Sequence, residues 1–370
     1  MNFNNNKVSA PQLGSIILLT VVGTGILTLP RALAENVGSD GWLLILLGTL
    51  LSAAVVLIHS HIVKSFPNKG YMEIISTCLS KPVAYIVVAL LVVYFIILNG
   101  FLVRLFAEVV KLFLLLRTPI EIIIFSLLLL GAYLARQGIE TLGRLAELLI
   151  PIVLVPSLIL FLLSLEGGDL GNLYPILKTP IPNILKEMPT ILFSFLGFDV
   201  LLIFGLYVNK PQKIAKSATR AILFIGALYL VLNLSVIVKF GVPQTTHLIW
   251  PTISLFKTID FPGLFIENVE GVVMGIWVLI VFMSIAPILL VKVILLQDLF
   301  SVKDNKCFAL PLLPPLYFVA LWGASLAESY AYLDKFVTYT APIVTLGIPG
   351  LILIVMTFKK KNKKEGEPNA

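Results

Sequence analysis

Apolar runs of about 20 residues, separated by short polar segments, constrain this chain more than any other feature. A helix of that length crosses the ~30 Å hydrocarbon core of a bilayer at about 1.5 Å per residue. Hydrophobic residues make up 58% of the chain and charged residues 13%, which is more apolar surface than a soluble core buries. The runs predict ten transmembrane helices, at 11–33, 41–63, 83–116, 119–135, 142–165, 184–208, 217–240, 267–296, 310–327 and 333–358. The expected fold class is an all-α integral membrane protein in which residues 1–370 form a single transmembrane domain.

The distribution of lysine and arginine predicts the orientation. Eighteen of the 27 basic residues, Lys292 among them, would share one face. They lie on the N-terminal segment, on alternate connections, near the ends of the helices that border them, or in the tail 359–370. Basic residues collect on the cytoplasmic side of membrane proteins, so we expect both termini and the basic tail to be cytoplasmic. Charges placed at helix ends also argue against nucleic-acid binding. Segment 1–10 lacks the basic region and cleavage site of a secretory signal, so we interpret the first apolar run as the first helix.

Sequence motifs that carry enzyme chemistry are missing. The chain contains no P-loop, no Gly-x-Ser-x-Gly, no His-Glu-x-x-His and no Cys-x-x-Cys pattern. Its two cysteines and three histidines show no spacing typical of a metal site. We therefore expect neither an enzyme nor a bound metal or cofactor.

Two of the expected helices carry features that weaken a helix in the middle of the membrane. In the helix expected at 11–33, Gly23 and Gly25 flank Thr24, and Pro30 removes a further backbone donor. In the helix expected at 184–208, the segment 195–199 contains a glycine at about the same depth. Irregular backbone is tolerated at that depth only where protein or a wet cavity surrounds it. We expect both helices to be broken there, although close packing of helices against glycine is the alternative.

Breaks in the first and sixth helices, five helices apart, predict two inverted five-helix repeats. The first repeat would span about 11–165 and the second about 184–358, followed by the basic tail. A central site would then lie between the two breaks. Peptide N–H and C=O groups freed at the half-helix ends would be available to a small solute.

Polar residues at mid-depth add side chains to this site. Asp199 near the bilayer centre costs about 2.5–3.5 kcal/mol on insertion scales, so it should face the interior. It has three possible roles, which are binding a ligand amine, carrying a proton, or bonding to broken backbone. The predicted ligand-binding residues are Gly23, Thr24, Gly25, Tyr94, Leu196, Gly197, Phe198, Asp199, Ser284 and Tyr339.

Several of these motifs occur, in the same order, in a known family. They are Gln12-Leu13-Gly14-Ser15, Gly23-Thr24-Gly25-Ile26-Leu27 with Pro30, Asn172-Leu173-Tyr174-Pro175, the run 193–202, Lys210-Pro211 and the segment 250–267. The first helix resembles that of the amino acid/polyamine/organocation transporter superfamily. Over nearly the whole chain, the sequence is similar to the spore germination receptor B subunits, the GerAB-like spore permeases.

The resemblance implies a LeuT-like fold and a germinant-sensing subunit in the inner membrane of a bacterial endospore. Such a subunit would bind a small amino-acid-like germinant at the midplane and pass a conformational shift to A-type and C-type receptor subunits. Two departures from the family pattern, Asn268 and Asp199, leave an outer ion pair and the ligand's identity open. The alternatives are an H⁺- or Na⁺-coupled amino-acid transporter, and a water or ion pathway through Tyr94, Leu196 and Tyr339.

Overall fold

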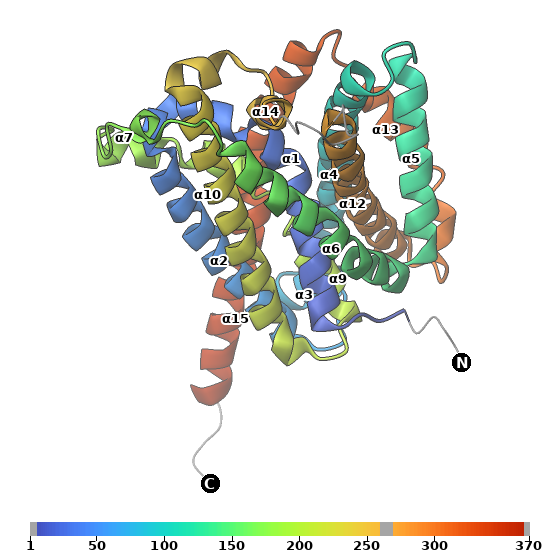
Figure 1. The fold of residues 1–370 in the computed structure, drawn as a ribbon. Coiled ribbons are helices and arrows are strands. Elements are labelled where there is room, and N and C mark those ends of the chain that lie inside the picture. The colour runs from blue at the N-terminus through green and yellow to red at the C-terminus, as the bar shows by residue number, and fades with distance from the viewer. Residues whose placement is uncertain (1–5, 260–268, 366–370) are drawn as a thin grey trace.

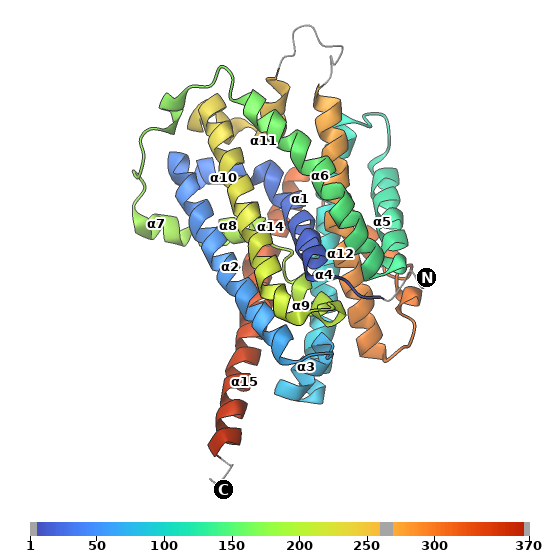
Figure 2. The same cartoon turned by 60° about the horizontal axis from the view of Figure 1, so that its bottom comes forward.

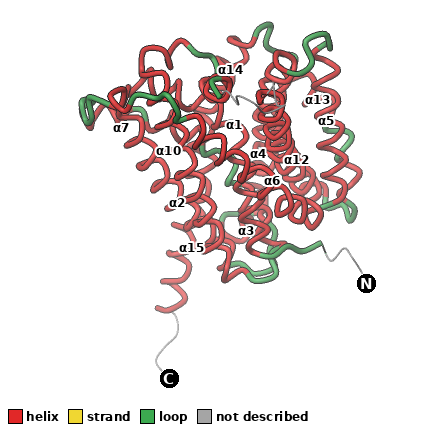
Figure 3. Tube along the Cα trace, viewed as in Figure 1, coloured by secondary structure: helices red, strands yellow, loops and turns green. Residues whose placement is uncertain are grey.

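The computed structural model describes residues 6–259 and 269–365, and within them the chain forms helices joined by loops (Figure 3). Seven helical stretches in these residues are long and apolar enough to cross a membrane. The described residues contain one isolated β-bridge, between Val8 and Val208, and no strand. The expected class of all-α membrane protein is confirmed, whereas the count of ten crossings stays a prediction.

The first five expected helices agree with the structure to within a few residues. They are α1 (Ala10–Val37), α2 (Gly41–Ser65), α4 (Lys81–Phe113), α5 (Ile120–Gln137) and α6 (Ile139–Ser164). The remaining long helices are α10 (Ile214–His247), α12 (Val269–Phe300), α14 (Leu326–Pro342) and α15 (Ile348–Glu365). The shorter ones are α3 (Tyr71–Cys78), α7 (Ile181–Lys186), α8 (Met188–Ser194), α9 (Val200–Phe204), α11 (Pro251–Lys257) and α13 (Leu313–Ala320).

The last two expected helices differ from the observed ones. The helix expected at 310–327 is reduced to α13, and the next begins at α14 rather than at residue 333. Ser325 explains the early start, because its side chain accepts a hydrogen bond from the Glu328 N–H at 3.2 Å and caps α14. Pro342 then removes a backbone donor, and a π-helical turn at Ile343–Gly347 links α14 to α15.

Helix α1 lies in the centre of the bundle. Figure 1 shows it between α2 and α10 on one side and α4 and α12 on the other, and Figure 2 shows α6 crossing in front of it. Small residues let these helices approach closely. A Cβ on Gly226 of α10 would overlap Thr49 of α2, and one on Gly48 of α2 would lie 2.6 Å from Ile191. We call the face that carries the start of α1, α3 and the end of α15 the proximal face, and the opposite face the distal face.

Two side chains join α4 to α12 inside the bundle. Asn99 Nδ2 donates to the Ile285 carbonyl and Lys292 Nζ to the Phe95 carbonyl, each at 3.4 Å. Lys292 is fully buried, although the orientation argument had counted it among the basic residues of the proximal connections. The difference arises because α12 continues to Phe300, so Lys292 lies about two turns inside the helix.

Replacing Lys292 by methionine should stabilise the protein. Its ammonium has three N–H donors, and the described residues offer one acceptor at 3.4 Å. A methionine of similar length keeps the packing and removes the buried polar group, so we expect a gain of about 1–3 kcal/mol. Thermal unfolding of the detergent-purified protein measures the effect, with the exposed Lys216→Met as control. A lower Tm for Lys292→Met would show that the ammonium is better satisfied than this geometry indicates.

Candidate functional site

The sixth expected helix is broken, as predicted. Helix α8 ends at Ser194, the turn 195–199 follows, and α9 begins at Val200. Gly197 makes the turn with a φ of +113°, a conformation that side-chain-bearing residues rarely adopt. A Cβ at this position would also lie 3.0 Å from Thr20 Cγ2 of α1, so the break packs directly against the central helix.

The predicted break in the first helix is wrong. Helix α1 runs without interruption from Ala10 to Val37, through both glycines and Pro30. The glycines serve close packing instead: a Cβ on Gly23 would overlap Ser284, and one on Gly25 would overlap the Tyr229 hydroxyl. The peptide groups of α1 therefore stay within the helix. The side chain of Thr24 and residue Asn268 lie outside what the structure describes.

Hydroxyl groups from neighbouring elements bind the carbonyls of α1. Ser284 Oγ donates to the Leu19 carbonyl at 3.0 Å. The Tyr229 hydroxyl lies 3.2 Å from the Val21 carbonyl oxygen and 2.9 Å from that of Ser194, and so connects α1 to the end of α8. These contacts place Ser284 against the first helix.

Thr252, which the sequence analysis missed, supplies the hydrogen-bond donor that Pro30 lacks in α1. Its Oγ1 donates to the Ile26 carbonyl at 2.5 Å. That carbonyl would normally accept from the N–H of residue 30, which is proline and has none. The proline signals that a donor is needed, but only the fold brings Thr252 to it.

Asp199 and Tyr94 form a buried polar pair beside the break. Their side chains are 3% and 5% exposed, and neither Asp199 Oδ1 nor the Tyr94 hydroxyl has a hydrogen-bond partner among the described residues. Both Tyr94 and Tyr71 lie within electrostatic range of the Asp199 carboxylate. Burial, and secondly the Asp199 charge, raise the pKa of Tyr71 at the start of α3. A polar centre thus lies on the α9 side of the break.

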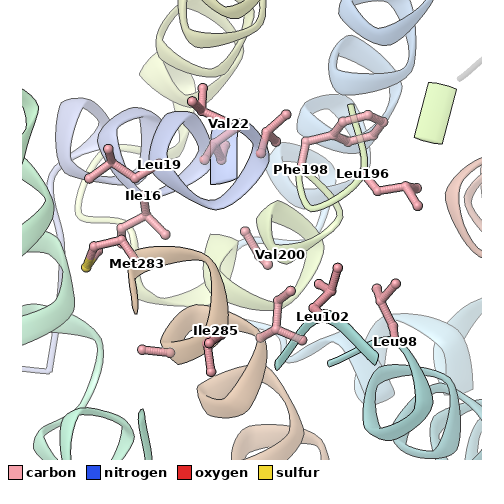
Figure 4. Close-up of a cluster of buried hydrophobic side chains, with 14 of the residues drawn as sticks. Ile16, Leu19, Val22, Leu98, Leu102, Leu196, Phe198, Val200, Met283 and Ile285 are labelled. Atoms are coloured by element: carbon pink, nitrogen blue, oxygen red, sulfur yellow. The ribbon is translucent and has the colours of Figure 1, made fainter. Parts of the chain in front are cut away.

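Leu196 and Phe198 belong to an apolar cluster around this centre. Figure 4 shows them with Val200, near side chains of α1, α4 and α12. Together with Val337 of α14 they line a cavity of about 60 Å³, which is large enough for a few water molecules and too small for an amino acid.

Tyr339 does not join the site. Its side chain is 69% exposed, because the buried residues of α14 are Ser329, Leu333, Val337 and Ala341, at spacings of four. The prediction placed Tyr339 by its depth in the membrane alone, and depth does not determine which face of α14 a residue occupies.

A larger cavity opens on the distal side of the break. Its volume is about 480 Å³, and it lies between α1, α8 and α14. Phe193 and Ser194 contribute to its wall just before the break. Sequence analysis did not identify this cavity, because its walls come from segments far apart in the chain.

Charged and apolar groups share the lining of this distal cavity. Arg31 and Glu35 of α1 form an ion pair at 2.8 Å, with side chains 39% and 44% exposed. Asp334 and Tyr330 of α14 also line the cavity. The volume is typical of ligand pockets. A cavity with both positive and negative side chains next to apolar walls suits a small molecule that has an amine and a carboxylate.

The loop 165–180 is attached to the distal end of α1. The buried Asp40, in the turn Gly38–Asp40 between α1 and α2, accepts hydrogen bonds from the N–H groups of Leu177 at 2.5 Å and Thr179 at 2.8 Å. Thr179 Oγ1 donates in turn to the Val37 carbonyl at 3.1 Å. The segment that leads into α7 and α8 is therefore attached to the distal end of α1.

Sequence comparison finds one family over most of the chain. A profile described as "Spore germination protein" matches residues 7–331. The chain is 26% identical to spore germination protein YndE of Bacillus subtilis (strain 168) over 97% of this chain and 99% of that protein. It is 28% identical to spore germination protein GerLB of Bacillus cereus over 99% of each chain. It is 31% identical to spore germination protein A2 of Bacillus subtilis (strain 168) over 74% of this chain and 75% of that protein.

Structural comparison finds a transporter fold. The structure of MhsT in complex with L-phenylalanine superimposes with a TM-score of 0.62, covering 93% of this chain and 98% of that chain at 16% sequence identity. At this identity the match establishes the LeuT-like fold alone.

Adding a methyl group at Gly25 should destabilise the bundle. The new Cβ would lie 2.8 Å from the Ser194 carbonyl oxygen and would overlap the Tyr229 hydroxyl. We expect Gly25→Ala to lose about 1–3 kcal/mol by overpacking. Gly275→Ala is the matched control, because that glycine is also helical and a Cβ there meets nothing within 4 Å. It should be neutral or gain up to about 1 kcal/mol in helix propensity. Equal thermal stability of the two variants would refute the close packing of α1.

Proposed function

Because the chain belongs to the spore germination protein family, the GerAB-like spore permeases, we propose that it is the germinant-sensing membrane subunit of a spore germination receptor. The family consists of permease-like membrane proteins and is not an enzyme family. The chain is itself an integral membrane protein with a LeuT-like fold. The sensing role and the ligand site go beyond these findings and are argued below.

One observation carries the proposal: the distal cavity of about 480 Å³ ends at the broken helix. A small germinant enters from the distal face and binds between α1 and α14. Arg31 holds its carboxylate, while Asp334 and Glu35 are available to its amine. Its apolar part lies against Phe193 and the other apolar side chains of the wall.

Ligand binding then acts on the break. Phe193 and Ser194 line the cavity, and Gly197 is the flexible position that follows them. A ligand that draws α8 toward α1 changes the angle between α8 and α9. It also alters the surroundings of Asp199 and Tyr94, which hold buried polar atoms without partners among the described residues. A ligand shifts this equilibrium only by its difference in affinity for the two arrangements.

The receptor context follows from the family. We place the protein in the inner membrane of the endospore, with both termini on the core side, beside an A-type and a C-type receptor subunit. The shift at the break passes to these partners, and germination follows from their response. Co-purification of tagged A-type and C-type subunits with this chain from spore membranes tests the assembly, and their absence from the eluate would count against it.

Substitutions at the cavity mouth test ligand recognition. Arg31→Gln and Asp334→Asn should each raise the germinant concentration for half-maximal germination about tenfold or more, because a charge-assisted hydrogen bond contributes about 1.5–3 kcal/mol. The control is Lys335→Gln, an exposed neighbour on α14 outside the cavity lining. Spore germination assays at matched protein levels give the readout. Wild-type responses in both cavity variants would exclude the distal cavity as the germinant site.

A transporter is the second candidate, supported by the fold shared with MhsT, whose structure contains L-phenylalanine. The two functions predict different results for labelled amino acid added to proteoliposomes that contain this chain alone. For a sensor we expect saturable binding of labelled amino acid without accumulation under a proton or sodium gradient. Accumulation driven by either gradient would establish transport and overturn a purely sensory role. The third possibility, a water or ion pathway, loses support because Tyr339 lies outside the site.

A further inference from the structure

A separate cavity of about 410 Å³ lies on the proximal face, away from the proposed germinant site. Its wall combines the turn between α5 and α6, the end of α12 and the loop that follows α12. Arg136 comes from the end of α5, while Lys303 and Lys306 come from the loop. Three cationic side chains from two distant parts of the sequence therefore converge on one cavity.

The charge of this cavity is not cancelled by its own carboxylate. Asp304 is the one acidic residue in its described lining, and its Oδ1 accepts the backbone N–H of Lys306 at 3.0 Å. Arg136, Lys303 and Lys306 take part in none of the ion pairs found in the described residues. Guanidinium and ammonium groups gathered in this way favour a phosphate group.

The framework of the cavity is held in place. Gln297 Nε2 donates to the Lys303 carbonyl at 3.3 Å and so attaches the loop to the end of α12. On the opposite wall, Gly138 precedes α6 with a φ of +85° and provides no side-chain cap. The first N–H groups of α6 therefore remain available to an anion next to the three cations.

An apolar surface begins at the edge of the cavity. Helix α5 lies at the margin of the bundle (Figure 1). Leu129 and Tyr133 of α5 are 44% and 66% exposed, and they precede Gln137 of the cavity lining at spacings of four on one face of the helix. A tyrosine between an apolar helix face and a basic helix end is typical of the level of lipid headgroups.

We propose that this cavity binds the headgroup phosphate of an anionic phospholipid, with an acyl chain along Leu129 and Tyr133 of α5. The lipid phosphate contacts Arg136, Lys303 and Lys306. The bound lipid also lies beside Tyr207, another lining residue, whose carbonyl accepts the Val8 N–H at 2.9 Å. The lipid thereby connects α5, α12 and the proximal end of the broken helix, and it needs no germinant to bind.

The test uses the full chain, purified in detergent and titrated with short-chain lipids. Dioctanoyl-phosphatidylglycerol should raise the Tm in a saturable manner, whereas dioctanoyl-phosphatidylcholine at the same concentrations should not. The variant Arg136→Gln/Lys303→Gln/Lys306→Gln should raise the apparent Kd for phosphatidylglycerol at least about tenfold, since each basic residue near a membrane contributes on the order of 1 kcal/mol. The single Lys306→Gln should raise it about fivefold and covers the case in which the triple variant does not fold.

Two control variants distinguish lipid binding in this cavity from a general effect of positive charge. Lys210→Gln/Lys213→Gln/Lys216→Gln removes the same charge from exposed lysines of another segment and should keep the Kd within about twofold of wild type. Arg136→Lys/Lys303→Arg/Lys306→Arg keeps the charge and should retain binding. An equal loss in the Lys210 triple variant, or equal stabilisation by the two lipids, would overturn the proposal. Equal stabilisation by inorganic phosphate at the same concentration would overturn the lipid as occupant and leave a soluble phosphate compound in its place.

Discussion

The architecture depends on the requirement that peptide groups inside a membrane find partners within the protein. In helix α1, Pro30 leaves the Ile26 carbonyl without its usual backbone donor. Thr252 from α11 supplies the missing donor to that carbonyl. Ser284 and Tyr229 add bonds to the carbonyls of Leu19 and Val21, nearer the start of the helix. The centre of the bundle is thus fixed by hydroxyl groups that reach α1 from three different helices, in addition to apolar packing. Those contacts bind a central helix that is continuous, while its neighbour is broken.

The two helices that were expected to form the site therefore differ in continuity. Helix α1 is continuous, whereas the segment from α8 to α9 bends at Gly197. The distal cavity is shared between them, and Asp199 with Tyr94 lies on the far side of the bend. Under the proposed function, α1 would act as the fixed wall and α8 as the wall that moves. The Asp40 contacts attach the segment leading into α8 to the end of α1.

Sequence periodicity and length predicted the membrane class, the first five helices and the break at Gly197, because each depends on local composition. The break expected in α1 was wrong because paired glycines have two physical uses, a weakened helix or a close approach, and only the positions of Ser284 and Tyr229 distinguish them. Lys292 and Tyr339 were misplaced for two different reasons. The end of the helix that holds Lys292 was set too early, so the depth of Lys292 was wrong. Tyr339 was assigned by its depth alone, and depth does not determine which face of a helix a residue occupies. The distal cavity could not be predicted, because Arg31 and Tyr330 meet only in the folded chain.

The backbone contact between the N-terminal segment and the broken helix affects how this protein can be handled. Val8 donates to the Tyr207 carbonyl at 2.9 Å and accepts from the Asn209 N–H at 3.0 Å, so the start of the chain is attached to the segment just after α9. An affinity tag or fluorescent fusion at the N-terminus would therefore act close to the segment that follows the broken helix. The end of α15 projects beyond the bundle (Figure 1), and labels attached there would leave that contact undisturbed.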